Sequence, residues 1–268
     1  MTQGDTHGIG GGKGPAVMIV VKAPVAGRSK TRLIPQLGEQ GAADLAAAMF
    51  RDTLSMAGSS AASVIVSFAP ADGLPALTAI ADTIDGRVVS VDAWLPQCDG
   101  SLTERLNDLF QTAFRLGYSP LIALGADSPD LPPAILRDAL DALQAAHDGP
   151  LVVLGPTEDG GYYLVGMSGP QCLADEHGRS LFGDIPWSTD QAFLATVENA
   201  CRMGIPVRVL DPWYDIDTPD DLDRLVTAFD TEPDTAQRAA ATFAALTDLP
   251  SARHVTGSDS DFPGALPA

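Results

Sequence analysis

The regular alternation of short apolar runs with helical patterns is the feature that most constrains the fold of this chain. The run Ala16–Val21 (AVMIVV) is continuously apolar and rich in β-branched residues, as expected of a strand buried on both faces. We predict further strands at Ser63–Ala69, Arg87–Val91, Pro120–Gly125, Leu151–Leu154, Tyr162–Val165 and Val207–Leu210.

Helical patterns separate these runs. Ser101 and Glu104 form an S-x-x-E capping box that opens a helix ending near Leu116. Thr218 followed by Pro219 is typical of a helix start. We predict other helices at Glu39–Ala57, Pro132–His147, Thr189–Met203 and after Pro233. Strands that alternate with helices indicate an α/β fold, a mostly parallel mixed sheet with helices on both faces.

The length of 268 residues suits one sizeable core. Residues 1–15 are Gly-rich and residues 248–268 are rich in Ser, Asp, Pro and Gly, so we expect disordered tails around a single domain spanning 16–247. No apolar run approaches the roughly 20 residues that cross a bilayer, and no signal-peptide layout opens the chain. With three widely spaced cysteines and no disulfide framework, we expect a cytoplasmic protein without membrane insertion.

The chain is strongly acidic but keeps one basic segment. Its net charge is −19, from 35 acidic and 16 basic residues, which argues against general nucleic-acid binding. Between Val17 and Gly38 there is no acidic residue, and two of the three lysines of the chain lie there together with two arginines. Such a segment in an acidic protein indicates an anion site, although a solvated charged turn is the alternative.

We interpret this basic segment, Lys22 to Leu33 (KAPVAGRSKTRL), as a phosphate-binding loop that follows the first strand. Gly27 lets the backbone approach an anion, and its neighbours supply N–H donors. Arginine offers forked donors to phosphate oxygens, and lysine a mobile point charge. The order of residues is not that of a P-loop. The candidate phosphate-binding residues are Lys22, Ala23, Pro24, Gly27, Arg28, Lys30, Thr31 and Arg32.

Three aspartates could bind a divalent metal. Asp127 follows a buried strand, while Asp215 and Asp217 share one side of a segment that is predicted to be extended. Ligand sites of open sheets lie beyond the carboxyl ends of the strands, where these loops and the basic loop can meet. Mg²⁺, or Mn²⁺, takes one or two protein carboxylates plus phosphates and water. Alternatively, Asp127 caps the helix that follows it.

A glycine pair beside a carboxylate and two aromatic residues marks the segment Gly155 to Tyr163 (GPTEDGGYY). Its spacing suits a tight hairpin that contacts a sugar-like acceptor, and a purely structural hairpin is an equal alternative. The candidate acceptor-binding residues are Glu158, Asp159, Gly160, Gly161 and Tyr162.

Five motifs in order, KAPVAGRSKTRL, GADSPDLP, GPTEDGGYYLVG, LFGDIPWST and WYDIDTPDDL, resemble the bacterial transferase family grouped as domain of unknown function 2064. That family is also labelled a radical-SAM/selenodomain-associated or arsenosugar-biosynthesis glycosyltransferase. The resemblance implies the nucleotide-diphospho-sugar transferase (GT-A) fold. It also implies that the loop after the first strand binds the nucleotide, that Asp127 and Asp217 bind the metal, and that the DGGYY segment meets the acceptor or sugar.

These expectations lead to three hypotheses of function. The first is a metal-dependent glycosyltransferase that moves a sugar from a nucleotide-sugar to a small-molecule acceptor, with Asp127, Asp159 and Lys30 as catalytic candidates. The second is a nucleotidylyltransferase that joins a nucleoside triphosphate to a phosphorylated or phosphonate acceptor, since four cations suit a triphosphate. The third is a non-catalytic nucleotide-binding module. The oligomeric state stays open.

Overall fold

The structure is a computed structural model that describes residues 12–82 and 89–248. Its described part contains one sheet with the strand order β3-β2-β1-β4-β6-β5-β7. The strands are β1 Gly14–Lys22, β2 Ser63–Ala69, β3 Ala93–Pro96, β4 Tyr118–Gly125, β5 Val152–Pro156, β6 Tyr162–Met167 and β7 Val207–Val209.

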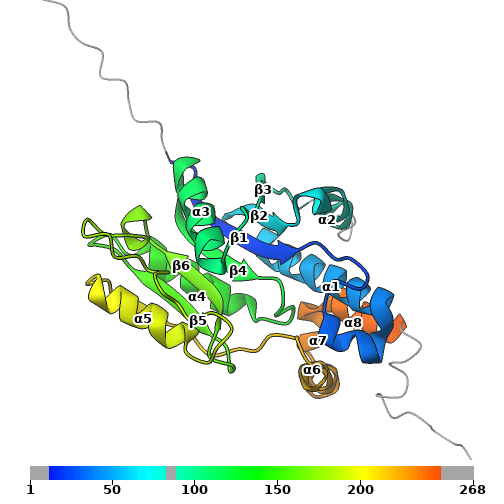
Figure 1. The fold of residues 1–268 in the computed structure, drawn as a ribbon. Coiled ribbons are helices and arrows are strands. Elements are labelled where there is room, and N and C mark those ends of the chain that lie inside the picture. The colour runs from blue at the N-terminus through cyan, green and yellow to red at the C-terminus, as the bar shows by residue number, and fades with distance from the viewer. Residues whose placement is uncertain (1–11, 83–88, 249–268) are drawn as a thin grey trace, which may run out of the picture.

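The sheet is mostly parallel, as predicted. β1, β2, β3 and β4 pair in parallel, and so do β5 and β7, whereas β6 runs antiparallel to both of its neighbours, β4 and β5 (Figure 1). The reversal of β6 follows from the tight turn that joins it to β5. The carboxyl ends of β1, β4 and β7 therefore lie at the same edge of the sheet.

Helices cover both faces of the sheet. They are α1 Ile34–Gly58, α2 Leu74–Ala81, α3 Leu102–Arg115, α4 Pro133–Gln144, α5 Ala192–Arg202, α6 Pro219–Thr231, α7 Thr235–Arg238 and α8 Ala240–Asp248. Val17 and Ile19 of β1 pack with α1, α2 and α4, whereas Met18 packs with α3 and α5. Since alternate side chains of a strand enter opposite cores, the run AVMIVV has to be apolar throughout.

Helix boundaries follow the capping chemistry that the sequence predicts. Ser101 and Glu104 form the expected capping box at the start of α3. Thr218 caps α6, with Pro219 as its first residue and Asp221 completing a second capping box. At the start of α1, Gly38 has a φ of 71°, so regular helix runs on from Glu39, the predicted first residue.

Several boundaries differ from the prediction by a few residues, and the sequence patterns did not predict α2. Residues 87 and 88 of the strand expected at 87–91 lie outside the described part, and residues 89–91 form no strand. Val89 and Val91 pack against the core instead, and pairing with β2 begins at Ala93. β1 begins at Gly14, inside the segment 1–15 that is expected to be a tail. The rest of both expected tails, 1–11 and 249–268, lies outside the described residues.

The last three helices pack together beside α1. α8 contacts α1 and α7, α7 contacts α6, and α6 shares an apolar cluster with α1 (Figure 1). The buried carboxylate of Asp52 on α1 accepts hydrogen bonds from the backbone N–H groups of Ala241 at 2.9 Å and Thr242 at 2.8 Å, the first turn of α8. Burial raises the pKa of Asp52, and these hydrogen bonds oppose that rise. Within the described residues, no helix is both long and apolar enough to span a membrane.

We predict that Asp52→Ala lowers the free energy of unfolding by about 1–3 kcal/mol, because it leaves two N–H groups at a buried helix start without an acceptor. Urea unfolding measures the change. Asp44→Ala is the matched control, because Asp44 is an exposed carboxylate on the same helix and its loss is expected to cost less than about 0.5 kcal/mol. Equal unfolding midpoints for the two variants would contradict the proposed role of Asp52.

Candidate active site

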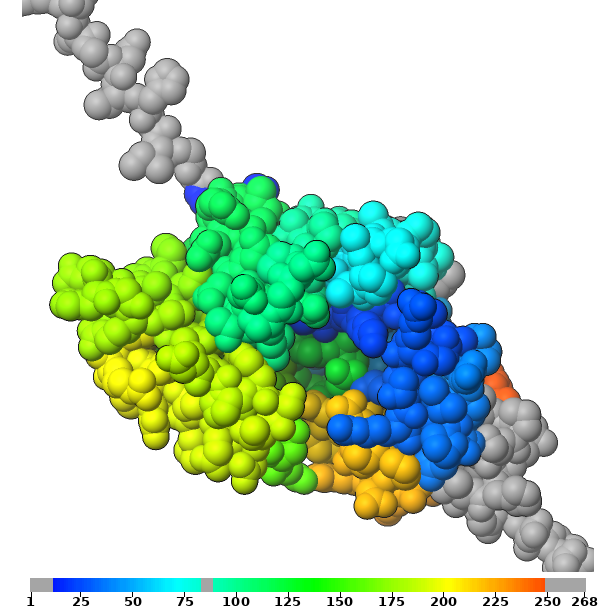
Figure 2. All heavy atoms as spheres, in the orientation of Figure 1, coloured from blue at the N-terminus to red at the C-terminus, as the bar shows by residue number. Residues whose placement is uncertain are grey.

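Three loops meet at the carboxyl edge of the sheet, one each after β1, β4 and β7. The backbone N–H of Ile216 in the loop after β7 donates to the carbonyl oxygen of Asp127 in the loop after β4, at 2.9 Å. Figure 2 shows a hollow in this face, bordered by the blue residues that follow β1 and by the orange segment that leads into α6. The convergence expected from the strand order is therefore present.

A small apolar cluster holds the basic loop against the loop after β7. Leu33 and Ile216 are both fully buried and belong to one cluster, which also includes Leu45, Met49, Tyr214, Leu222, Leu225 and Leu246. Because Leu33 follows Lys30 by three residues and Ile216 precedes Asp217, packing of these two apolar side chains brings the cation to the carboxylate. The position of the charged groups thus depends on apolar burial.

Lys30 lies between two of the three predicted metal carboxylates. Its Nζ pairs with Oδ1 of Asp127 and, at 2.8 Å, with Oδ1 of Asp217. The Lys30 side chain is 8% exposed, whereas those of the two aspartates are about half exposed. Burial alone would lower the pKa of Lys30, but the charges of Asp127 and Asp217 outweigh it and raise that pKa above its ordinary value.

The backbone at Lys30 is left-handed, with a φ of 45°. This conformation costs a residue with a Cβ roughly 1–2 kcal/mol, so the surrounding contacts must maintain it. The turn before it is held by Ser29, whose Oγ accepts from the N–H of Val25 at 2.9 Å. The N–H groups of Arg28 and Ser29 both donate to the carbonyl of Val25. These two amides, which the sequence offered as anion donors, are already used within the loop.

A cavity of about 360 Å³ opens beside this loop. We call it the phosphate cavity, after the phosphate-binding role predicted for the loop. Most of the predicted phosphate-binding residues line it, whereas Ala23, Pro24 and Gly27 do not. Lys22 donates from Nζ to the carbonyl oxygen of Arg28 at 3.0 Å, so it folds back over the loop. The charged and hydroxyl side chains of the lining are Lys22, Arg28, Ser29, Lys30, Thr31, Arg32, Asp127 and Asp217.

The residues that could hold a metal are a pair. No group of three or more His, Cys, Asp or Glu side chains within 12–82 and 89–248 has the arrangement of a metal site. Asp127 and Asp217, however, already converge on one cation, the ammonium of Lys30. Two carboxylates that reach one cation beside a phosphate cavity fit Mg²⁺, which completes its shell with water and substrate phosphates.

Asp215 differs from its neighbour Asp217. Its Oδ1 accepts a hydrogen bond from Oγ of the buried Ser128 at 2.8 Å. Burial raises the pKa of Asp215 to about 6, the Ser128 hydrogen bond opposes this, and the charges of Asp127 and Asp217 add to the rise. Asp215 is therefore harder to ionise than an ordinary carboxylate, and its predicted role as a metal ligand stays a prediction.

Asp130 anchors the loop after β7, a role that the sequence did not reveal. This buried carboxylate accepts hydrogen bonds from Oη of Tyr214 at 2.7 Å and from Nε1 of Trp213 at 3.2 Å. The guanidinium of Arg224 lies 3.8 Å from the ring centre of Tyr214. Asp130 therefore fixes the loop that carries Asp215 and Asp217.

Hydrogen bonds and close packing fix the glycine-containing turn between β5 and β6. Oδ1 of Asp159 accepts from Oγ1 of Thr157 at 2.5 Å and from the N–H of Gly161 at 3.1 Å, which closes the turn. Gly160 has a φ of 86°, and a Cβ there would lie 2.3 Å from the backbone of Asp190. Glu158 forms an ion pair with Arg224 at 2.7 Å.

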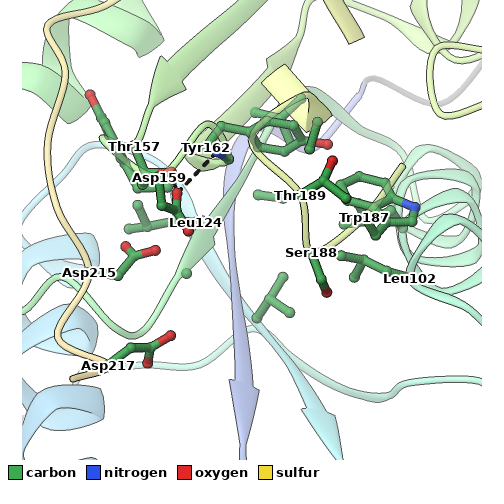
Figure 3. A pocket seen from close by; sticks show the side chains of 18 of the residues that line it. Leu102, Leu124, Thr157, Asp159, Tyr162, Trp187, Ser188, Thr189, Asp215 and Asp217 are labelled. Atoms are coloured by element: carbon green, nitrogen blue, oxygen red, sulfur yellow. Dashed lines mark hydrogen bonds between the residues drawn. The ribbon is translucent and has the colours of Figure 1, made fainter. Parts of the chain in front are cut away.

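A second cavity, of about 540 Å³, lies next to the first. We call it the acceptor cavity, because several of the predicted acceptor-binding residues line it. Asp159, Gly161, Tyr162 and Asp215 line it, whereas Glu158 and Gly160 do not. Val20, Arg32 and Asp217 line both cavities, so the two adjoin there. Figure 3 shows Asp159, Asp215 and Asp217 on one side and Leu102, Trp187, Ser188 and Thr189 on the other.

The candidate residues chosen from the sequence do not include the side of the cavity formed by Leu102, Trp187, Ser188 and Thr189. Leu102 comes from the start of α3, and Trp187 to Thr189 come from an irregular segment before α5. The segment LFGDIPWST was part of the family resemblance, which was the only signal that pointed to it. Helix α5, which follows this segment, contacts the turn between β5 and β6 through the N–H of Phe193 and the carbonyl of Gly160 at 2.9 Å, and this contact depends on tertiary packing.

Comparison with solved structures agrees with this architecture. A chain from Desulfovibrio desulfuricans G20, provisionally assigned as a nucleotide-diphospho-sugar transferase, is 27% identical, with a TM-score of 0.73 over 90% of this chain and 97% of that one. A 4-diphosphocytidyl-2C-methyl-D-erythritol synthase from Anaerococcus prevotii DSM 20548 is 9% identical, with a TM-score of 0.51 over 82% and 99% of the two chains.

A CMP:2-keto-3-deoxy-manno-octonic acid synthetase complexed with CTP is 13% identical, with a TM-score of 0.50 over 82% of this chain and 100% of that one. At such low identity the last two show the fold alone. No curated protein matches this chain. A family described as an uncharacterized protein conserved in bacteria, domain of unknown function 2064, matches residues 53–189, just over half of the chain. The chain belongs to this family, and it has the nucleotide-diphospho-sugar transferase fold.

Proposed function

We propose that the protein is a metal-dependent transferase that uses a nucleotide-activated donor, and that it moves a glycosyl group from a nucleotide-sugar to a small acceptor. The similarity to the Desulfovibrio chain supports a transferase that uses nucleotides. The glycosyl group, the metal and the small acceptor go beyond this similarity and rest on the geometry of the site.

One observation carries this proposal. Four cations of a single loop surround a cavity that also contains two carboxylates converging on one cation position. Cations alone would suit any anion. Their combination with a pair of aspartates suits a diphosphate that arrives with a divalent metal, because Asp127 and Asp217 would hold the metal and the metal would offset the charge of the phosphates.

The charged side chains of the site have different roles in the proposed reaction. Bound at Asp127 and Asp217, Mg²⁺ or Mn²⁺ would neutralise charge on the departing diphosphate. Lys30, displaced from the two aspartates, would bind phosphate oxygens together with Lys22, Arg28 and Arg32. Asp159 lines the acceptor cavity, where its carboxylate orients the acceptor hydroxyl and accepts its proton. The acceptor oxygen bonds to the anomeric carbon as the carbon–oxygen bond to the diphosphate breaks.

Nucleotidylyl transfer is the second candidate, and the charge of the loop favours it. Four cations provide more positive charge than a diphosphate-sugar requires, and they match a triphosphate better. The two reactions differ in which ligand binds. Calorimetry with Mg²⁺ and each nucleoside triphosphate, repeated with UDP- and GDP-sugars, separates them. Binding of a triphosphate without binding of any nucleotide-sugar would contradict glycosyl transfer, and no binding of either class would contradict both.

We predict that Lys30→Ala weakens binding of the nucleotide by about 10- to 100-fold, because a charge-assisted hydrogen bond is worth about 1.5–3 kcal/mol. Calorimetric titration with the donor found above measures the change. Lys13→Ala is the matched control, since Lys13 lies before the body of β1, over the ring of Tyr118 and away from both cavities. If Lys30→Ala and Lys13→Ala bind the nucleotide equally well, the phosphate site is elsewhere.

We predict that Asp127→Ala removes the gain in nucleotide affinity that Mg²⁺ produces, while affinity without metal stays the same or rises because Lys30 loses a competing partner. The titration is run with Mg²⁺ and with a chelator. Asp138→Ala, an exposed aspartate of α4 outside both cavities, controls for the loss of one negative charge. An Asp127→Ala protein that still binds the nucleotide more tightly with Mg²⁺ would refute the proposed metal pair.

A further inference from the structure

We infer that the acceptor cavity takes a phosphate-free, polyhydroxylated acceptor with one apolar face, such as a neutral sugar or cyclic polyol. This inference deepens the proposed function, on which the word acceptor rests. It follows from the chemistry of the two walls of the acceptor cavity and from the contrast between this cavity and the phosphate cavity beside it.

Charge divides the cleft into two halves. The phosphate cavity has four basic and two acidic side chains in its lining, whereas the acceptor cavity has four acidic side chains and one basic one, Arg32. The acidic ones are Asp159, Asp190, Asp215 and Asp217. Arg32 and Asp217 lie where the cavities join, so the part of the acceptor cavity beyond the junction contains acidic side chains without a basic one. A phosphate there would face like charges.

One wall of the acceptor cavity is apolar and rigid. The Nε1–H of Trp187 donates to Oγ1 of Thr103 at 2.8 Å, so the polar edge of the indole is bound to the protein. Tyr162 packs against the indole, with ring centres 5.9 Å apart and an interplanar angle of 69°. Leu102 adds an apolar surface that is 41% exposed. Aromatic and aliphatic groups fixed in this way bind the C–H face of a sugar ring.

The opposite wall supplies hydrogen-bond acceptors. Ionised carboxylates only accept, so they pair with hydroxyl donors. Thr157, Ser188 and Thr189 add hydroxyl groups to the lining, which can donate or accept. A cyclic polyol satisfies both walls at once, since its hydroxyls point outward from an apolar ring face. A phosphorylated compound would satisfy the apolar wall but not the acidic one.

Saturation-transfer NMR on the full chain tests this inference. The probes are methyl glycosides of glucose, galactose, mannose and ribose, each compared with the corresponding sugar phosphate. Each titration is run with and without UDP and Mg²⁺. We expect at least one neutral glycoside to bind, and each phosphate to bind more weakly than its neutral counterpart whenever Lys22, Arg28 and Arg32 are blocked by UDP.

Leu102→Ala attributes the signal to the acceptor cavity. It is expected to weaken glycoside binding at least threefold, while Leu116→Ala leaves binding unchanged. Leu116 is the matched control because it is equally exposed, at 41%, and lies at the other end of α3, outside the cavity. The inference is overturned if no neutral glycoside shows a signal that Leu102→Ala reduces, or if the phosphates bind this cavity more tightly than the neutral compounds.

Calorimetry on the same samples keeps the two proposals apart. Nucleotide binding without glycoside binding would overturn the acceptor class and leave the donor site intact. Glycoside binding that depends on Leu102, in a protein that binds no nucleotide, would overturn the proposed transferase but support the sugar-binding cavity.

Discussion

The pairing of Lys30 with Asp127 and Asp217 is the interaction on which the candidate site depends. It joins three loops that are distant in sequence, and it places a buried ammonium between two half-exposed carboxylates. The neighbouring apolar cluster, which includes Leu33 and Ile216, positions these loops without any ligand. The charges are thus gathered before a substrate arrives, and a ligand that brings its own cation has a position prepared for it.

Positive and negative side chains gather in different parts of the cleft. Cations gather after β1, and carboxylates gather on the turn between β5 and β6 and on the loop after β7. This distribution suits the proposed reaction, in which a donor rich in phosphate would bind at one end of the cleft and an acceptor rich in hydroxyls at the other. Arg32 and Asp217 lie where the two cavities meet, which is where the transferred group would pass in the proposed reaction.

The sequence predicted the parts of the site that depend on strand order and local charge. Buried runs predicted the α/β sheet, and the carboxyl-edge rule predicted that the loops of Lys30, Asp127 and Asp217 meet. Local rules also predicted the capping boxes of α3 and α6. These features depend on short stretches of chain or on a general property of parallel sheets.

Other features depend on tertiary packing that no local pattern encodes. The pattern around Val89 and Val91 predicts a strand, because apolar side chains that pack beside a sheet give the same sequence pattern as the side chains of a strand within the sheet. Trp187 and Leu102 come from an irregular segment and a helix start, and only the folded chain brings them to one cavity. The use of Lys30 as the counter-cation for both aspartates was also hidden, since its charge suggested a phosphate partner.

A structure of the protein crystallised with Mn²⁺ and a nucleotide, with the metal located by its anomalous scattering, is the most direct test of the central claim. We expect one metal peak between Asp127 and Asp217, with the Nζ of Lys30 moved from the carboxylates to a phosphate oxygen. A nucleotide bound while Lys30 still bridges both aspartates, or a metal bound elsewhere, would contradict the account.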